Sequence, residues 1–394
     1  MATIKRGRQF LGFNVAVIKF CMLWTNNFEE KYSAKRFLKD ATMIFSLMPC
    51  ALSIFADFMM QLYDGTESVT SIVENVIALI CIIGMIYMVV CFARNRKNIH
   101  LLLVKINSFK KYGSFGEVLE VDEKANLFSK LFIFYGILGN FVYMLMPQLS
   151  IQKCQAKRNM QMINDDVPCG LVVRSRFPFK FDYSPMFEIV FVHPIYTCTV
   201  VTIVVLVLTM LLCGFLMHVI HQLGHLKKYI AALKDEHPQE KIYAKLAKCI
   251  KYHIQIIEYS QELANSFSSM LLFYITLTSI VLSVLCFEII MVEAFEDSVR
   301  FALHLVGWLI ILLSVCYYGQ QLIDRSQNIA DDVYSIKWVN QTVEIQKRIH
   351  MIILRSQTPL TLSAAGMGVV SLPAFLKVLS SAYSFFTLLL KFKP

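Results

Sequence analysis

Charged residues are scarce in this sequence of 394 residues, of which only 17% are Asp, Glu, Lys or Arg. Hydrophobic residues make up 56%, and the mean hydropathy is +0.55. Soluble domains have about 25% charged and roughly 45–50% apolar residues. Because a soluble core could not bury so much apolar surface, we expect lipid to solvate much of the chain. The composition therefore predicts an integral membrane protein.

Paired cysteine motifs are also missing. The 11 cysteines include no Cys-x-x-Cys and no Cys/His spacing that is typical of a metal site. Most of them lie within apolar runs, where a thiol is a small and inert packing group. Cys154 and Cys169 share one predicted loop. They either pair, if that loop is extracellular, or stay free, because the sequence does not supply the geometry that decides between the two.

The sequence also lacks a constellation of residues that indicates an enzyme. His218, His221 and His225 have the spacing to share one face of a helix, which is compatible with a metal site. They stand at a helix end without acidic partners, however, where histidines interact favourably with the helix dipole. We therefore expect no enzyme activity, no metal and no cofactor.

The net charge of +10 lies in loops between apolar runs, which suits lipid headgroups better than a phosphate groove, so we expect no nucleic acid. Residues 1–35 contain no short apolar segment followed by a small-residue cleavage site. We therefore expect no cleaved leader, and we expect the first span to be retained.

Seven apolar runs are long enough to cross a hydrocarbon core of ~30 Å, which takes ~20 helical residues. We expect an all-α polytopic membrane protein whose spans are residues 38–62, 69–93, 127–149, 190–218, 266–292, 301–323 and 366–390. The last run has small and polar residues on one side, so we expect it to face a bundle centre or water rather than lipid alone. We divide the chain into residues 1–323, with spans one to six, and residues 324–394.

Lys and Arg are distributed unevenly between the two sets of loops. One set, which includes the N-terminal segment, holds 26 of them, and the other set holds 9. The positive-inside rule then predicts a cytoplasmic N-terminus and an extracellular C-terminus. The sequon at Asn340 falls on the predicted inside and should carry no glycan.

Two segments on the predicted inside have apolar residues at helical spacing. Residues 224–266 continue spans four and five as long helices with a turn at Pro238, and residues 329–354 form a second amphipathic helix. Such helices either lie on the membrane surface or pack between subunits to form an anchor region.

The C-terminal hundred residues contain a specific set of positions, namely Ala330-Asp331-Asp332-Val333-Tyr334, Trp338, Arg348, Arg355-Ser356-Gln357, Pro359, Gly366, Ser371-Leu372, Phe375 and Tyr383-Ser384 with Phe386-Thr387-Leu388-Leu389. With these residues the segment resembles insect odorant receptors. The resemblance implies a tetrameric, ligand-gated, nonselective cation channel in the plasma membrane of olfactory sensory neurons. In that family an odorant-tuned subunit assembles with a shared odorant co-receptor, and this chain looks like the tuned kind. We assign subunit contacts to Tyr334, Trp338, Arg348, Arg355 and Gln357.

The last span is the expected pore wall. One face of it must meet the pore axis, where hydroxyls can solvate an ion and aromatic rings can constrict the path. The resemblance makes Tyr383 the predicted constriction, because it matches the gate neighbourhood of that family. Lys391 at the outer mouth should repel cations. The candidate pore residues are Leu379, Ser380, Tyr383, Ser384, Thr387 and Lys391.

A small volatile ligand needs an apolar cavity with a few orienting polar groups, which we expect in the outer halves of spans two to six. Asn140 and His304 stand out, because polar groups at membrane depth usually have a partner or a function. The full set of candidates is Ile72, Asn75, Val76, Gly139, Asn140, Tyr143, Met146, Phe191, His193, Tyr196, Thr197, Ser279, Ser283, Phe287, Phe301, His304 and Leu305.

Two alternatives stay open at this point. A seven-helix G-protein-coupled receptor would need the reverse orientation and an Asn-Pro-x-x-Tyr motif in the last span, and the Asp324-Arg325-Ser326 motif follows span six instead of span three. A secondary transporter would be expected to show repeated spans and charged residues in the middle of its helices. We find no internal repeat of the spans and no charged residue in the middle of spans two to six.

Overall fold

The computed structural model of this chain describes residues 9–24, 34–64, 69–113, 115–161, 169–179, 181, 183–233, 239–292, 295–336 and 338–391. These residues form helices and no named strand. The elements are α1 (Gly12–Phe20), α2 (Ala34–Asp64), α3 (Val69–Ile106), η1 (Asn107–Lys111), α4 (Phe115–Leu149), α5 (Ile151–Gln161), α6 (Met186–Ala231), α7 (Gln239–Met291), α8 (Phe295–Tyr334), α9 (Val343–Ser356) and α10 (Leu372–Leu390).

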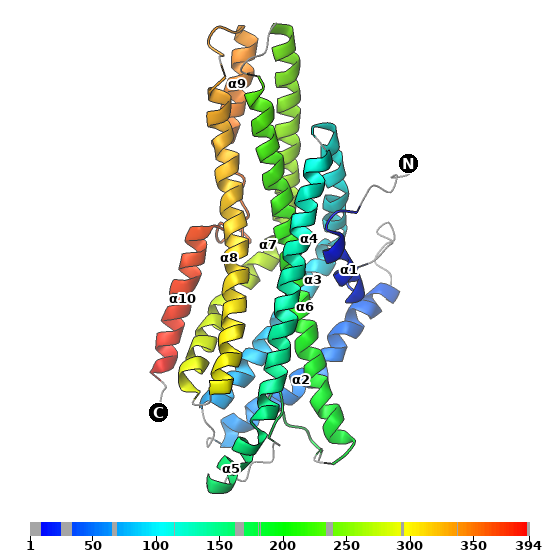
Figure 1. The fold of residues 1–394 in the computed structure, drawn as a ribbon, viewed down its shortest axis with the longest axis vertical. Coiled ribbons are helices and arrows are strands. Elements are labelled where there is room, and N and C mark those ends of the chain that lie inside the picture. Colours follow the sequence, from blue (N-terminus) through cyan, green and yellow to red (C-terminus); the bar gives the residue numbers. More distant parts are fainter. Residues whose placement is uncertain are drawn as a thin grey trace.

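Seven of the described helices are long and apolar enough to cross a membrane, namely α2, α3, α4, α6, α7, α8 and α10. The prediction of an all-α protein with seven spans is confirmed. The helices form an elongated bundle (Figure 1). Its upper end in that view carries α9, the end of α6 and the start of α7, and its lower end carries α5 and the start of α8. We use these two names below.

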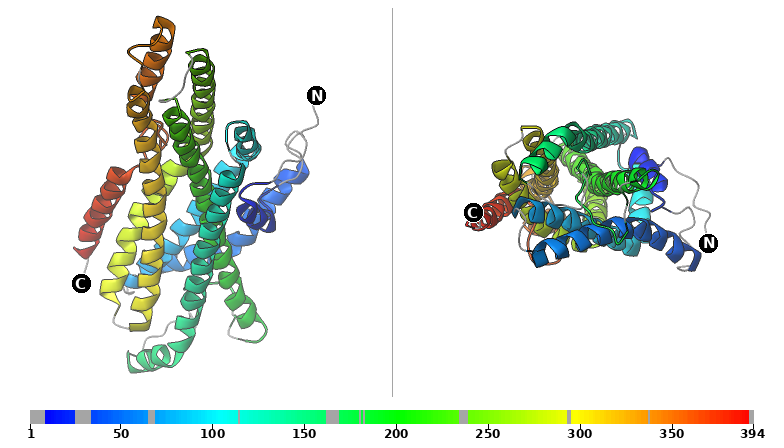
Figure 2. Two further views of the ribbon diagram at one scale, coloured as in Figure 1. Left: turned by 45° about the horizontal axis from the view of Figure 1, so that its top comes forward. Right: turned by 90° about the horizontal axis from the view of Figure 1, so that it is seen from below.

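The centre of the bundle is built from α6 and α7. In their most apolar windows 72% and 67% of the residues are buried, compared with 11% in α4 and 11% in α10. Seen from below, α10 lies at one edge of the bundle and α1 at the opposite edge (Figure 2). The described chain therefore covers little of α10, which must meet lipid or another subunit on its remaining faces.

The sequence analysis did not foresee α1, which inserts against α4. The backbone N–H of Leu11 donates to Oδ1 of Asp122 over 2.7 Å, and Nδ2 of Asn14 donates to Oγ of Ser129 over 3.0 Å. These hydrogen bonds provide partners for polar groups at the start of α1 that would otherwise have none. Gly214 on α6 leaves the space that the Leu11 side chain fills, since a Cβ at Gly214 would lie 2.6 Å from Cδ2 of Leu11.

The predicted helical continuation over 224–266 agrees with the structure, in which α6 runs to Ala231 and α7 begins at Gln239, although Pro238 lies outside the described residues. The prediction of one helix over 329–354 was wrong. Residues up to Tyr334 belong to α8, and α9 starts only at Val343. Thr342 has an extended backbone with ψ 151°, which no helix can continue through.

The last span starts later than the apolar run at 366 suggested. Gly366 has φ +78°, a left-handed conformation that interrupts a helix, and α10 begins only at Leu372. Ser371 caps it, because its Oγ accepts from the backbone N–H of Ala374 over 3.4 Å. Pro373 lies in the first turn, where its missing N–H costs nothing.

Candidate ligand cavity and pore helix

An apolar cavity of about 160 Å³ lies between α2, α3, α4, α6, α7 and α8, in the half of the bundle nearer the lower end. Its walls are mostly aliphatic side chains, small residues and thiols. Lining residues that the sequence analysis did not single out are Cys50, Ile54, Ile77, Ala78, Cys81, Ile82, Tyr135, Gly136, Val173, Cys198, Val201, Thr202, Val205, Leu206, Leu277, Arg300, Leu303, Gly307, Trp308 and Ile311.

Glycines on α4 and α8 make room for the cavity and for its walls. A Cβ on Gly136 would overlap the Leu206 side chain, and one on Gly307 would lie 3.1 Å from Cε1 of Tyr135. A Cβ on Gly139, in contrast, would meet nothing within 4 Å. Gly139 therefore borders open space, whereas Gly136 and Gly307 allow close packing.

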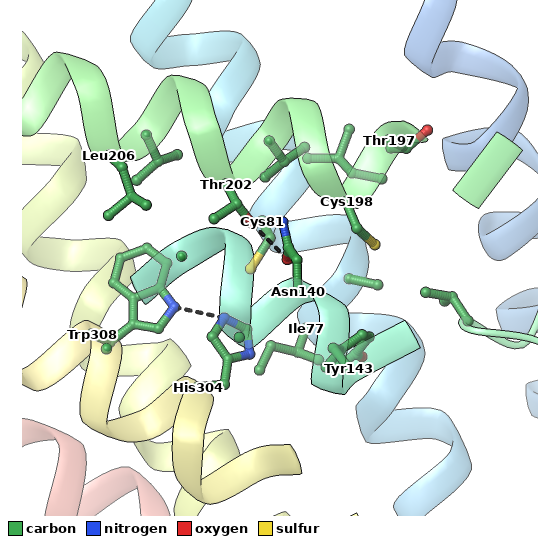
Figure 3. A pocket seen from close by; sticks show the side chains of 18 of the residues that line it. Ile77, Cys81, Asn140, Tyr143, Thr197, Cys198, Thr202, Leu206, His304 and Trp308 are labelled. Atoms are coloured by element: carbon green, nitrogen blue, oxygen red, sulfur yellow. Dashed lines mark hydrogen bonds between the residues drawn. The ribbon is translucent and has the colours of Figure 1, made fainter. Parts of the chain in front are cut away.

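Two polar pairs project into this apolar site (Figure 3). Oγ1 of Thr202 donates to Oδ1 of Asn140 over 3.1 Å, and Nε1 of Trp308 donates to Nε2 of His304 over 3.0 Å. The first pair joins α6 to α4, and the second lies one turn apart on α8. Polar groups at membrane depth are stabilised by such partners.

Arg300 forms the rim of the cavity toward the lower end. Its guanidinium lies 4.8 Å from the ring centroid of Tyr143, and its Nη2 donates to Oε1 of Glu74 over 2.6 Å. Asp297 is 3.5 Å from the same nitrogen. Only 7% of the Arg300 side chain is exposed, so this buried cation is held by carboxylates and an aromatic face.

Residues 169–179 cover the cavity from outside the helices. Val173 lines the cavity, while Nε of Arg174 lies 3.2 Å from Oδ2 of the fully buried Asp57 on α2. The backbone N–H of Arg176 donates to the carbonyl of Ser53 over 3.1 Å. The segment is therefore tied to α2 directly after the position where it meets the cavity.

The pairing considered for Cys154 and Cys169 can be checked for Cys169 only. Cys169 is disulfide-bonded, whereas the side chain of Cys154 lies outside the described residues. Nine other cysteines are free, as expected of packing thiols.

Five predicted pocket residues line the cavity, namely Gly139, Asn140, Tyr143, Thr197 and His304. The structure places the other twelve elsewhere. Asn75 donates to Asp57 over 2.8 Å, and His193 and Tyr196 contact Ser46 over 2.9 and 3.1 Å. The residues Ile72, Val76, Met146, Phe191, Ser279, Ser283, Phe287, Phe301 and Leu305 are not among its lining residues. They share helices with residues that do line it.

The candidate pore residues follow α10. Ser380, Tyr383, Ser384 and Lys391 are exposed, whereas Leu379 and Thr387 are half-buried. Val378 and Ala382 are buried on the opposite side, where the helix packs on α7 and α8. The exposed face carries Tyr383, which is 67% exposed, together with the hydroxyls of Ser380 and Ser384. This helix thus presents an uncovered face that carries the predicted constriction.

The candidate interface residues Tyr334, Trp338, Arg348, Arg355 and Gln357 gather at the upper end. Nη2 of Arg348 donates to the hydroxyl of Tyr243 over 2.5 Å, and this hydroxyl donates to Oε1 of Glu344 over 3.0 Å. Hydrogen bonds from Tyr243 and from Arg348 lower the pKa of the Glu344 carboxyl. The contacts join α9 to α7.

The histidine cluster on α6 has acidic partners, contrary to expectation. Nε2 of His218 lies 3.6 Å from Asp122, and Nε2 of His221 lies 4.0 Å from Glu117. Both carboxylates come from α4, so the sequence around the histidines could not reveal them. Within the described part of the chain no group of three His, Cys, Asp or Glu residues is arranged to hold a metal ion.

Comparisons with known proteins agree on one family. The 7tm odorant receptor profile matches residues 68–383. The chain is 29% identical over 154 residues to putative odorant receptor 92a of Drosophila melanogaster, covering 39% of this chain and 38% of the relative. It is 25% identical over 169 residues to odorant receptor Or2 of Anopheles gambiae, covering 43% and 45%. These matches thus span less than half the length of each relative.

Among solved structures, the fold is similar to that of the insect olfactory receptor OR5 from Machilis hrabei. The complex of that receptor with eugenol aligns with a TM-score of 0.76 at 15% identity, covering 97% of this chain and 98% of the other. A second structure of that receptor gives a TM-score of 0.76 at 16% identity, covering 97% of both chains. At these identities the likeness concerns the fold alone.

Proposed function

This chain belongs to the 7tm odorant receptor family, and we propose that it is an odorant-gated, nonselective cation-channel subunit that works as a heteromer with the shared odorant co-receptor. The observation that carries the proposal is the apolar cavity of about 160 Å³, which has a few polar side chains on its wall. Apolar pockets with few orienting polar groups are typical of small-molecule sites.

We propose that the upper end lies in the cytoplasm and the lower end outside. The segments that carry the larger share of Lys and Arg are at the upper end, which favours this orientation. The cavity then lies in the outer half of the membrane, where a volatile ligand can reach it. Residues 1–323 would supply the pocket, and residues 324–394 the pore helix and the anchor region.

We propose α10 as the pore wall, with Tyr383 at the constriction and Lys391 toward the outer mouth. The uncovered face of α10 supports this role, since only 11% of the most apolar window of that helix is buried within the chain. A ring of aromatic side chains from several subunits can gate a pore by excluding water.

Coupling between cavity and pore would run through α7 and α8. Both helices line the cavity, through Leu277 and through His304 and Trp308, and both pack against α10. A ligand that changes how α8 packs on its neighbours would therefore also shift the support of the pore helix.

The test is electrical recording from cells that express this chain alone, the co-receptor alone, or both, across an odorant panel. We expect odorant-evoked current that requires this chain together with the co-receptor and that persists when G-protein signalling is blocked. A ligand-driven second messenger without current would instead favour a G-protein-coupled receptor.

A further inference from the structure

A second hollow, a groove of about 300 Å³, lies between α6 and α8 at the upper end of the bundle (Figure 1). Its floor contains the buried side chains of Leu223 and Ile329. Its polar lining residues are Lys227 of α6 and Arg325, Asn328 and Asp332 of α8. The side chains of Lys227, Arg325 and Asn328 are exposed, so the groove has an apolar floor and polar walls that a ligand can reach.

The charges in this groove do not cancel. Nζ of Lys227 lies 3.0 Å from Oδ1 of Asp332, so these two residues neutralise each other. Arg325, in contrast, has no hydrogen bond or ion pair with the part of the chain that the structure describes. The carboxylate next to it in sequence, Asp324, accepts from Nε2 of Gln320 over 2.8 Å and does not line the groove. One positive charge in the groove therefore lacks a partner.

Gly224 leaves open space beside that charge. Outside its own helix, a Cβ built on Gly224 would meet one atom within 4 Å, which is Nη1 of Arg325 at 3.5 Å. The guanidinium thus extends from α8 across to the backbone of α6, and no side chain at position 224 occupies the space in front of it. Asn328, one turn further along α8, adds an amide that can also donate.

The groove begins where two apolar spans end. The apolar runs are residues 190–218 of α6 and 301–323 of α8, and the lining residues follow both of them. Arg325 is two positions past the second run, a rise of ~3 Å along the helix. The headgroup layer of a bilayer is about 5–8 Å thick on each side. Arg325 therefore lies at the depth of lipid headgroups, and in the proposed orientation these belong to the cytoplasmic leaflet, whose surface is negatively charged.

The chemistry of the groove matches a phosphate group. A guanidinium has a planar fork of donors that fits two phosphate oxygens, and basic pockets between membrane-spanning helices bind phosphorylated headgroups. We propose that this groove binds the phosphate of an anionic phospholipid of the cytoplasmic leaflet, with Arg325 as its main partner and Asn328 as a second donor. The inference goes beyond the proposed function and takes from it only the orientation of the bundle.

The experiment follows the thermal stability of the full chain in lipid nanodiscs. The nanodiscs contain phosphatidylcholine alone or phosphatidylcholine with increasing shares of phosphatidylinositol bisphosphate. A ligand that binds the native state raises the melting temperature by mass action. We expect a rise that saturates, and the share of anionic lipid at half of the rise measures the affinity. No rise, or a rise that stays linear over the whole range, would overturn the inference.

Variants test whether the groove causes the rise. Arg325→Gln should increase the half-saturating share of anionic lipid at least about tenfold, because it removes a charge-assisted contact. Gly224→Leu fills the groove without changing the charge and should abolish the saturating rise. Arg94→Gln is the matched control, because Arg94 is exposed, directly follows the apolar run 69–93 and does not line the groove. It should change the half-saturating share by no more than about fivefold, the general effect of one charge near an anionic surface.

Two further results would contradict the inference. If Arg325→Gln and Arg94→Gln had equal effects, the rise would reflect general attraction to basic residues. If soluble inositol trisphosphate stabilised the chain in pure phosphatidylcholine as strongly as the lipid does, the occupant would be a free phosphate compound. The melting temperature in phosphatidylcholine alone checks that each variant folds, and if Gly224→Leu does not, the two arginine variants decide. None of these readouts uses an odorant or a current, so their failure would leave the channel proposal standing.

Discussion

The carbonyl oxygen of Val370 packs directly against Gly319 of α8, so closely that a Cβ at Gly319 would overlap it. Val370 immediately precedes the cap of α10, and its own side chain is fully buried. This contact sets where the last span leaves the bundle. Backbone atoms cannot yield as the end of a flexible side chain can, so the position has no room for another residue type.

Replacing Gly319 by Ala should therefore displace the start of α10. Overpacking of this kind costs about 1–3 kcal/mol, and we expect a lower melting temperature in detergent together with reduced odorant-evoked current. Gly368→Ala is the control, because a Cβ there would meet nothing within 4 Å. Equal stability and current for the two variants would show that the contact does not position the pore helix.

Gly139→Leu should fill the cavity without disturbing its walls. The first atom of the new side chain would enter space that holds no neighbour within 4 Å, and the rest would occupy volume that the ligand needs. We expect normal surface expression with half-activating concentrations raised at least about tenfold, equivalent to about 1.4 kcal/mol of binding free energy. Unchanged potency would place the ligand elsewhere, and Gly368→Leu controls for the added bulk.

Asp57→Asn should loosen the segment that covers the cavity. The buried Oδ2 and Oδ1 atoms of Asp57 lie 3.2 Å from Nε of Arg174 and 3.6 Å from Nε of Arg176. The substitution removes the negative charge that faces these two guanidinium groups. Breaking such a pair costs about 3–5 kcal/mol when both partners are buried, and we expect less here because the arginines are partly exposed. The readouts are thermal stability and faster current decay after odorant washout.

The control for Asp57→Asn is Glu120→Gln, which breaks an exposed ion pair with Lys124 on α4. Surface pairs of this kind contribute little, so neither stability nor washout kinetics should change. If both variants behaved alike, the buried carboxylate would have no particular role in holding the loop.

Lys391 should limit conduction by this chain alone. It is exposed one residue past the end of α10, so symmetric assembly of four copies would place four ammonium groups around the outer mouth, where they repel cations. We expect little current from the chain alone and more from its Lys391→Gln variant. Lys347→Gln on α9, also exposed, should change nothing. Robust cation current through the unaltered homomer would refute this role.

Acid should weaken the contact between α9 and α7. The pKa of Glu344 is lowered from 4.5 by hydrogen bonds from Tyr243 and Arg348, so its contribution to stability is present above pH 4.5 and is lost as the pH falls through the lowered value. The native protein should therefore melt slightly higher than Glu344→Gln at neutral pH. The difference should shrink as the pH falls below 4.5 and vanish below the lowered pKa of Glu344, and a difference that grew there would have the wrong sign.

The chain's seven spans and their all-helical character could be predicted from the sequence. A bilayer imposes both length and helicity, because backbone polar groups in hydrocarbon must bond within their own segment. The long continuation of α6 and α7 past the apolar spans could also be predicted. Apolar residues keep the helical period of 3.6 residues there, although the segments are no longer apolar throughout. The resemblance at the C-terminal end supplied the family.

Tertiary structure determines which residues line the cavity. In a membrane both the lipid-facing and the inward-facing sides of a helix are apolar, so hydrophobicity does not report which way a helix is turned. His193 was therefore included among the candidates beside His304, although only His304 lines the cavity. The sequence analysis did not single out Arg300, whose place on the cavity rim depends on Glu74, which is 226 residues away in the chain.

Hydrophobicity alone also did not predict where the last helix begins or how the first helix packs. Hydropathy marked 366 as the start of an apolar run, but Gly319 and the cap at Ser371 determine that α10 begins at Leu372. The insertion of α1 depends on Asp122 and Ser129 of α4, which lie more than 100 positions along the chain. The sequence by itself determined which segments enter the membrane, because transfer into lipid depends on each segment's own composition. Only the packed bundle determined which faces meet, because that depends on contacts between residues distant in the chain.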